Sequence, residues 1–133
     1  MKKQIEQLIE WHKKFGVPYR TEPCPFDDSD ENMALLRLRA RLMEEEVKEW
    51  KEAATYNMDS PFRAKELTDI LYVVFGTIIT EGLQDYIEQA FDAVHASNMS
   101  KVDDNGNPIK RADGKVLKGP NYKEPDLSFI TNH

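Results

Sequence analysis

Hydrophobic residues recur every three or four positions through roughly the first hundred residues, the spacing that places side chains on one face of an α-helix. This pattern predicts helices over residues 1–16, 31–56, 61–81 and 83–101. Gly16 closes the first of these segments and Gly82 follows the third, and both are typical helix stops. No segment alternates strongly enough between apolar and polar residues to build a sheet. The pattern therefore predicts an all-α protein.

The two central segments carry the strongest apolar patterns. The segment 31–56 has a continuous stripe that we expect to lie in the core, made of Leu36, Ala40, Met43, Val47, Trp50 and Ala54. The middle of the segment 61–81 is apolar on every side, which predicts a central helix shared with another subunit. Its apolar run, 70–79, is well short of the roughly 20 residues that cross a bilayer, so no membrane segment is predicted. In the last segment we expect an inward face made of Ile87, Ala90, Phe91 and Val94.

The composition changes on both sides of these core helices. Residues 17–30 are rich in proline and predict a linker between the N-terminal helix 1–16 and the core helices 31–101. Residues 102–133 contain the turn signals DDNGNP and ADGK and predict an extended, basic tail. We expect one domain, a bundle of about four to five helices with this tail, assembled as an oligomer.

Charge and cysteine content narrow the class of protein. The chain has 133 residues and a net charge of −6, which argues against a nucleic-acid-binding protein. Its one cysteine, Cys24, allows no disulfide within the chain and favours a reducing, cytoplasmic compartment. The sequence contains no phosphate-binding loop, dinucleotide-binding glycine pattern or zinc-protease motif.

Two glutamates in the segment 31–56 occupy positions where an apolar residue is expected. Glu46 and Glu49 continue a second stripe that is otherwise apolar, formed by Leu35, Leu38, Leu42 and Ala53. Acids on a solvated helix are commonly paired with a Lys or Arg three or four residues away, but neither of these glutamates has one. Both have further glutamates at those spacings instead. The pattern therefore predicts that something outside this helix neutralises them.

The next helix repeats the arrangement with Glu66 and Asp69, although Arg63 and Lys65 are close by and weaken the argument there. Because packed helices lie about 8–10 Å apart, carboxylates from two facing stripes can converge on one point. A set of carboxylates without His or Cys is a hard oxygen site that favours Mg²⁺, with Mn²⁺ as a substitute. The alternative is that all four are ordinary surface acids on charged helices.

Polar residues that suit a phosphorylated ligand follow these acids. Asn98 and Lys101 extend the inward face of the last helix and are suited to a sugar hydroxyl and a phosphate. The tail adds cations that could close over a polyphosphate, namely Lys110, Arg111, Lys115, Lys118 and Lys123. The alternatives are a lysine that complements the helix dipole and a solvated tail.

Together these motifs resemble a known superfamily. The EExxE pattern of Glu45, Glu46 and Glu49, the ExxD pattern of Glu66 and Asp69, and the element SNMSK are similar to those of the all-α nucleoside triphosphate pyrophosphohydrolases. That superfamily includes MazG-like enzymes, dimeric dUTPases and phosphoribosyl-ATP pyrophosphohydrolase. The resemblance extends over roughly residues 33–122. The combination of the three motifs is far more specific than EExxE alone.

The resemblance implies a Mg²⁺-dependent enzyme that cleaves a nucleoside triphosphate between the α- and β-phosphates. The implied metal ligands are Glu45, Glu46, Glu49, Glu66 and Asp69, with Glu45 and Glu49 also implied in catalysis. The implied substrate contacts are Asn98, Lys101, Arg111, Lys115, Lys118 and Tyr122. The family also implies a homodimer or homotetramer, and the tail suggests dUTP or dCTP as substrate.

Two other functions remain open at this point. The first is a biosynthetic enzyme of the phosphoribosyl-ATP pyrophosphohydrolase type. The second is a helical oligomerisation or regulatory module without activity, whose acids bind the basic surface of a partner. Release of pyrophosphate from a nucleotide would separate both enzymes from the module.

Overall fold

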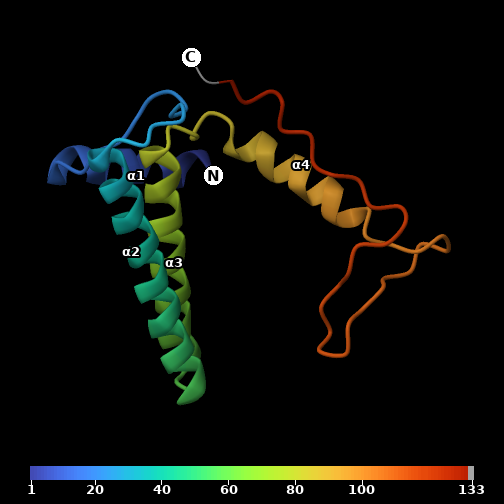
Figure 1. Ribbon diagram of the computed structural model, residues 1–133. Coiled ribbons are helices and arrows are strands. Elements are labelled where there is room, and N and C mark those ends of the chain that lie inside the picture. Colours follow the sequence, from blue (N-terminus) through green and yellow to red (C-terminus); the bar gives the residue numbers. More distant parts are fainter. Residues whose placement is uncertain (132–133) are drawn as a thin grey trace. The chain divides into compact units, whose positions relative to one another are not determined.

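The computed structural model describes residues 1–131, and within this range the chain forms four α-helices. These are α1 (Lys2–Phe15), α2 (Asp30–Thr55), α3 (Ser60–Thr80) and α4 (Ile87–Met99) (Figure 1). The described chain contains no β-strand beyond isolated bridges, so the prediction of an all-α fold is confirmed. None of these helices is long and apolar enough to cross a membrane.

The described chain divides into two compact units, residues 1–84 and residues 85–131. In the first unit, α2 and α3 run side by side as an antiparallel hairpin, and α1 packs against α3 (Figure 1). The second unit contains α4 and the tail up to residue 131.

The boundaries of the hairpin follow from local chemistry. The hydroxyl of Ser29 caps α2 by accepting a hydrogen bond from the amide of Asn32 (3.3 Å). Pro61 lies in the first turn of α3, where its missing N–H removes no helical hydrogen bond. Gly82 ends α3 with a φ of +74°, and the linker runs so close to it that a Cβ there would stand 1.8 Å from the carbonyl oxygen of Glu22.

The predicted start of α4 is four residues too early. Residues 84–86 form a turn shortly after Gly82, and the helix begins at Ile87 rather than at residue 83. Its apolar face is not buried within the second unit, because Phe91 is 64% exposed and Val94 is 41% exposed. The residues of the second unit therefore do not form the interior that the prediction of an inward face requires.

A polar junction joins the three helices of the first unit. His12 of α1 and Arg39 of α2 are both buried, and both meet α3 at Gly76. Arg39 donates hydrogen bonds to the carbonyl oxygen of Val73 (2.9 Å) and the hydroxyl of Thr77 (3.1 Å). Burial lowers the pKa of His12, and the nearby charge of Arg39 acts in the same direction. The junction thus adds polar contacts to the buried apolar residues of α1 and α3, which include Ile5, Leu8 and Ile79.

Much apolar surface of the hairpin is left uncovered. On α2, Val47 is 48% exposed and Trp50 is 36% exposed, so the predicted core stripe is not buried at these residues within the first unit. On α3, the exposed apolar side chains are Phe62, Leu67, Leu71 and Tyr72. The fully buried apolar set is small by comparison and includes Ile5, Leu8, Ala53 and Ile79. Exposed apolar area of this extent is typical of a surface that another molecule covers.

The second unit shows that the tail has defined turns. Antiparallel bridges join Val102 to Pro108 and Lys110 to Val116. The buried hydroxyl of Ser97 on α4 donates to the carbonyl oxygen of Lys123 (2.6 Å), which ties the returning chain to the helix. The expected extended tail therefore contains two tight hairpin-like turns over residues 102–116. Its last two residues, 132 and 133, lie outside the described range.

Candidate metal centre

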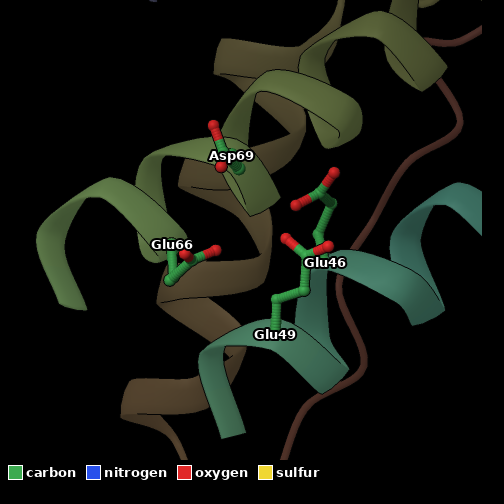
Figure 2. A group of neighbouring side chains, drawn as sticks. All are labelled: Glu46, Glu49, Glu66 and Asp69. Atoms are coloured by element: carbon green, nitrogen blue, oxygen red, sulfur yellow. The ribbon is translucent and has the colours of Figure 1, made fainter. Parts of the chain in front are cut away.

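Four carboxylates meet in the seam between α2 and α3. Ligand oxygens of Glu46, Glu49, Glu66 and Asp69 all lie within 4.8 Å of one another, and we call these residues the acid cluster. Figure 2 shows the pair from α2 pointing toward the pair from α3. The i, i+3 spacing within each pair places both side chains on one helix face, about one turn apart.

Buried and half-buried residues of α2 and α3 lie next to the acid cluster along both helices. Ala53, one turn beyond Glu49 on α2, is 3% exposed, and Val73, one turn beyond Asp69 on α3, is half-buried. Within the cluster, Glu66 is 8% exposed, whereas Glu49 is the most accessible of the four. The seam therefore has one side open to solvent, where Glu49 lies.

The buried oxygens of the cluster are not satisfied by the protein. Oε2 of Glu46 and Oε2 of Glu66 have no hydrogen-bond partner among residues 1–131. A buried polar atom without a partner costs free energy and calls for an explanation such as an ion or a water. Burial raises the pKa of Glu46, and the charges of Glu49 and Asp69 raise it further.

Lys65 is the cation that the structure places at the cluster. Its Nζ lies 2.7 Å from Oδ2 of Asp69 and 3.7 Å from Oε1 of Glu66, and its side chain is 64% exposed. Arg63, the other nearby cation in the sequence, turns its Nη2 toward the hydroxyl of Ser60 (3.4 Å). One exposed ammonium faces four carboxylates, so the acids are not each neutralised by a basic residue of their own.

This arrangement fits a divalent cation. The donors are carboxylate oxygens from two rigid helices, and two of the buried oxygens lack a partner. Hard oxygen donors of this kind suit Mg²⁺ or Mn²⁺, whereas Zn²⁺ and Cu²⁺ sites in proteins typically include His or Cys. A cation between the helices would also relieve the repulsion among the four acids.

The other predicted site residues lie outside the acid cluster. Glu45 is exposed on α2 and is not one of the four grouped acids. Asn98 and Lys101 lie at the end of α4 in the second unit, where the amide of Lys101 donates to the carbonyl oxygen of Asn98 (3.2 Å). Asn98 is exposed, and Lys101 is half-buried.

The basic tail residues have partners of their own. Arg111 forms an ion pair with Asp113, two residues away in the tail (2.5 Å). Nζ of Lys118 lies 4.6 Å from the centre of the Tyr122 ring, so these two predicted substrate contacts are neighbours. Lys110 and Lys115 are exposed. Lys65, which the sequence analysis gave as a nearby cation, pairs with Asp69 at i, i+4 spacing.

A comparison with known protein families identifies one matching family. A family model described as phosphoribosyl-ATP pyrophosphohydrolase matches residues 8–98, more than half of the chain. The match contains α2, α3 and the whole acid cluster, and it ends before Lys101 and the tail. No curated protein matches the sequence significantly. The chain therefore belongs to the phosphoribosyl-ATP pyrophosphohydrolase family of the MazG-like all-α superfamily, and it is a nucleotide pyrophosphohydrolase that acts on phosphoanhydride bonds.

Proposed function

We propose that the acid cluster binds Mg²⁺ and that the protein cleaves a nucleoside triphosphate, dUTP or dCTP, to the monophosphate and pyrophosphate. The observation that carries this proposal is the convergence of four carboxylates whose buried oxygens, on Glu46 and Glu66, lack protein partners. Family membership supplies the reaction class. The nature of the donors supports Mg²⁺, with Mn²⁺ as a substitute.

The exposures within the cluster suggest a division of roles. We propose that Glu46, Glu66 and Asp69, which are partly or fully buried, hold the ion. We further propose that Glu49, which is exposed to solvent, accepts a proton from the attacking water. Glu45, also exposed on α2, would orient that water or hold a further ion. A bound divalent ion would neutralise charge on the phosphates and lower the pKa of a coordinated water.

The bond changes of the proposed reaction are simple. The water oxygen attacks the α-phosphorus while the bond from that phosphorus to the bridging oxygen of the β-phosphate breaks. The water proton passes to a carboxylate, and pyrophosphate leaves. Most of the acceleration in such a transfer comes from positioning and electrostatic stabilisation, which a rigid helical seam is suited to provide.

We propose that residues of the second unit contact the substrate. Asn98 offers an amide for a sugar hydroxyl, and Lys101 offers an ammonium for a phosphate. The tail would add further contacts from Arg111, Lys115, Lys118 and Tyr122. Because Lys118 and Tyr122 already lie together, we expect them to act as one contact. Arg111 would have to exchange its ion pair with Asp113 for a phosphate.

A second candidate substrate is phosphoribosyl-ATP. The observation in its favour is the family match itself, whose description names that substrate. The tail favours a nucleoside triphosphate instead, because residues 102–131 lie beyond the matched segment and bring extra cations. Both substrates require cleavage of the same kind of bond, so the acid cluster does not distinguish them.

The experiment is a substrate panel. The purified protein is incubated with Mg²⁺ and, separately, with each canonical ribonucleotide and deoxynucleotide triphosphate and with phosphoribosyl-ATP. We expect equimolar pyrophosphate and monophosphate, with the highest kcat/KM for dUTP or dCTP. Highest activity on phosphoribosyl-ATP would replace the substrate proposal by the second candidate. Orthophosphate as the product, or no product from any nucleotide, would overturn the proposed reaction.

We also propose that the protein is a homodimer or homotetramer in the cytoplasm. The support for self-association is the uncovered apolar surface of α2 and α3, which includes Val47, Trp50, Leu67 and Leu71. Helical hairpins with such faces bury them by packing against a second hairpin. The single cysteine and the absence of any possible disulfide within the chain support a reducing compartment.

A further inference from the structure

The position of Lys65 is not explained by the stability of α3. Lys65 precedes Asp69 by four residues, and a cation placed N-terminal to its acid is the less favourable orientation of an i, i+4 pair in a helix. A lysine that is 64% exposed also gains little from one ion pair in water. A stronger electrostatic attraction than this one ion pair is therefore needed to explain why the ammonium lies beside Asp69 and Glu66.

The acid cluster provides that reason. The Lys65 ammonium is in contact with Asp69 at 2.7 Å and with Glu66 at 3.7 Å, and these acids are packed against Glu46 and Glu49. The field of the whole cluster thus attracts this one side chain.

We propose that Lys65 is the resident counter-ion of the acid cluster, which holds Asp69 while no divalent cation is bound and releases it when one binds. This inference rests on the proposed function, because it assumes that the cluster is a cation site. The exposed side chain of Lys65 has room to move toward solvent, so release needs no change in the helices. Lys65 is a positioning residue in this scheme and takes no part in bond breaking.

The scheme has two energetic consequences. In the metal-free protein, the ammonium offsets part of the repulsion among the four carboxylates. In the metal-bound protein, the same ammonium competes with the ion for Asp69 and repels it, which weakens cation binding. Lys65 therefore sets the cation affinity of the site below the value that the four acids would otherwise reach.

The test uses Mn²⁺ as a paramagnetic probe and the full-length protein. The Kd for Mn²⁺ is measured by electron paramagnetic resonance for the wild type and for Lys65→Met, and melting temperatures are measured in chelator and with Mn²⁺. We expect Lys65→Met to bind Mn²⁺ roughly three- to tenfold more tightly. We also expect it to melt at a lower temperature in chelator and to show a larger stabilisation by Mn²⁺.

Two further variants serve as controls. Lys51→Met removes the same charge from an exposed position on α2, two residues or about 200° from Glu49, and should leave the Kd unchanged. Lys65→Arg retains the charge and should restore a Kd close to that of the wild type. A merely structural role of Lys65 would change the melting temperature without the gain in affinity.

Each alternative outcome has a distinct meaning. If the wild type binds Mn²⁺ and Lys65→Met matches Lys51→Met, the inference is overturned while the cation site stands. If Lys65→Met instead loses Mn²⁺ binding, Lys65 orients Asp69 for the ion and the competition described above is wrong. If the wild type binds no Mn²⁺ or Mg²⁺, the proposed function fails together with the inference.

Discussion

Arg39 occupies the space that a side chain on residue 76 would need. A Cβ at Gly76 would stand 2.6 Å from Nη2 of Arg39 and 3.1 Å from Nε2 of His12. Because Arg39 is 6% exposed and its guanidinium is hydrogen-bonded to Val73 and Thr77, the guanidinium cannot move aside without losing these bonds. Glycine at position 76 therefore leaves the space in which Arg39 and His12 meet α3.

We expect Gly76→Ala to destabilise the protein despite the better helix propensity of alanine. Overpacking of about 1–3 kcal/mol opposes a propensity gain of up to about 1 kcal/mol, so a net loss of about 1 kcal/mol is expected. Urea unfolding of the metal-free protein measures the change. In an Arg39→Met background the same substitution should cost less. An equal cost in both backgrounds would place the clash elsewhere.

Glu49→Gln tests the proposed chemistry. The amide cannot accept a proton at neutral pH, so we expect kcat for pyrophosphate release to fall at least about a hundredfold. The fold should be retained, and the metal-free melting temperature should stay equal or rise, because one like charge leaves the acid cluster. The matched control is Glu52→Gln, an exposed acid on the same helix, which should keep its activity. A large loss of stability in Glu49→Gln would point to a structural role instead.

His12 predicts a pH dependence of stability. Its pKa in the folded state is lowered from 6.5 by burial, so the unfolded chain takes up a proton first as the pH falls. The contribution of neutral His12 is complete above about pH 6.5 and is lost progressively as the pH falls below that value. The positive charge of Arg39 opposes protonation of His12. The hydrogen bond between Nδ1 of His12 and the carbonyl oxygen of Pro18 (3.2 Å) acts in the other direction and favours protonation.

The measurement is the free energy of unfolding from pH 5 to pH 8 in the wild type and in His12→Asn. We expect the wild type to lose more stability than the variant on going from pH 7 to pH 5. His95→Asn is the control, because His95 is exposed on α4, and its profile should follow that of the wild type. Parallel profiles for the wild type and His12→Asn would show that His12 is not buried as a neutral ring.

The acid cluster was within reach of sequence reasoning because its signal is local. The i, i+3 spacing of Glu46 with Glu49 and of Glu66 with Asp69 fixes the face on which each pair lies. The absence of a cation three or four residues from Glu46 or Glu49 marks that face as unusual. Because α2 and α3 are regular helices packed against each other, the four acids meet in the seam between them. Their role as metal ligands is a proposal.

Other features were out of reach because they depend on distant residues. Arg39 lies in the segment RLRAR, which is typical of a solvated helix face, yet it is buried where Gly76 of α3 leaves space for its guanidinium. The apolar residues Val47 and Trp50 predict a buried face, yet a pattern does not indicate whether the same chain or another molecule covers it. The start of α4 was misplaced because residues 83–86 are compatible with helix, whereas 84–86 form a turn shortly after the left-handed Gly82.

The uncovered face of α3 predicts the effect of a charge placed on it. Leu67 is 48% exposed and Leu71 is 54% exposed, one turn apart on the same face. In an assembled oligomer these side chains would be desolvated, so Leu71→Glu would bury a charge at the interface. We expect light scattering coupled to size exclusion to show a dimer or tetramer for the wild type. Leu71→Glu should shift toward the monomer with an increase in dissociation constant of at least about tenfold.

The matched control is Phe26→Glu, which replaces a large apolar side chain that is 92% exposed in the linker. It changes charge and hydrophobicity in the same way as Leu71→Glu. Because Phe26 is not on the exposed face of α3, this substitution should leave the mass of the oligomer unchanged. A wild type that is monomeric at all concentrations would contradict self-association. An oligomer that tolerates Leu71→Glu would instead place the interface elsewhere, with the α2 residues Val47 and Trp50 as the next surface to test.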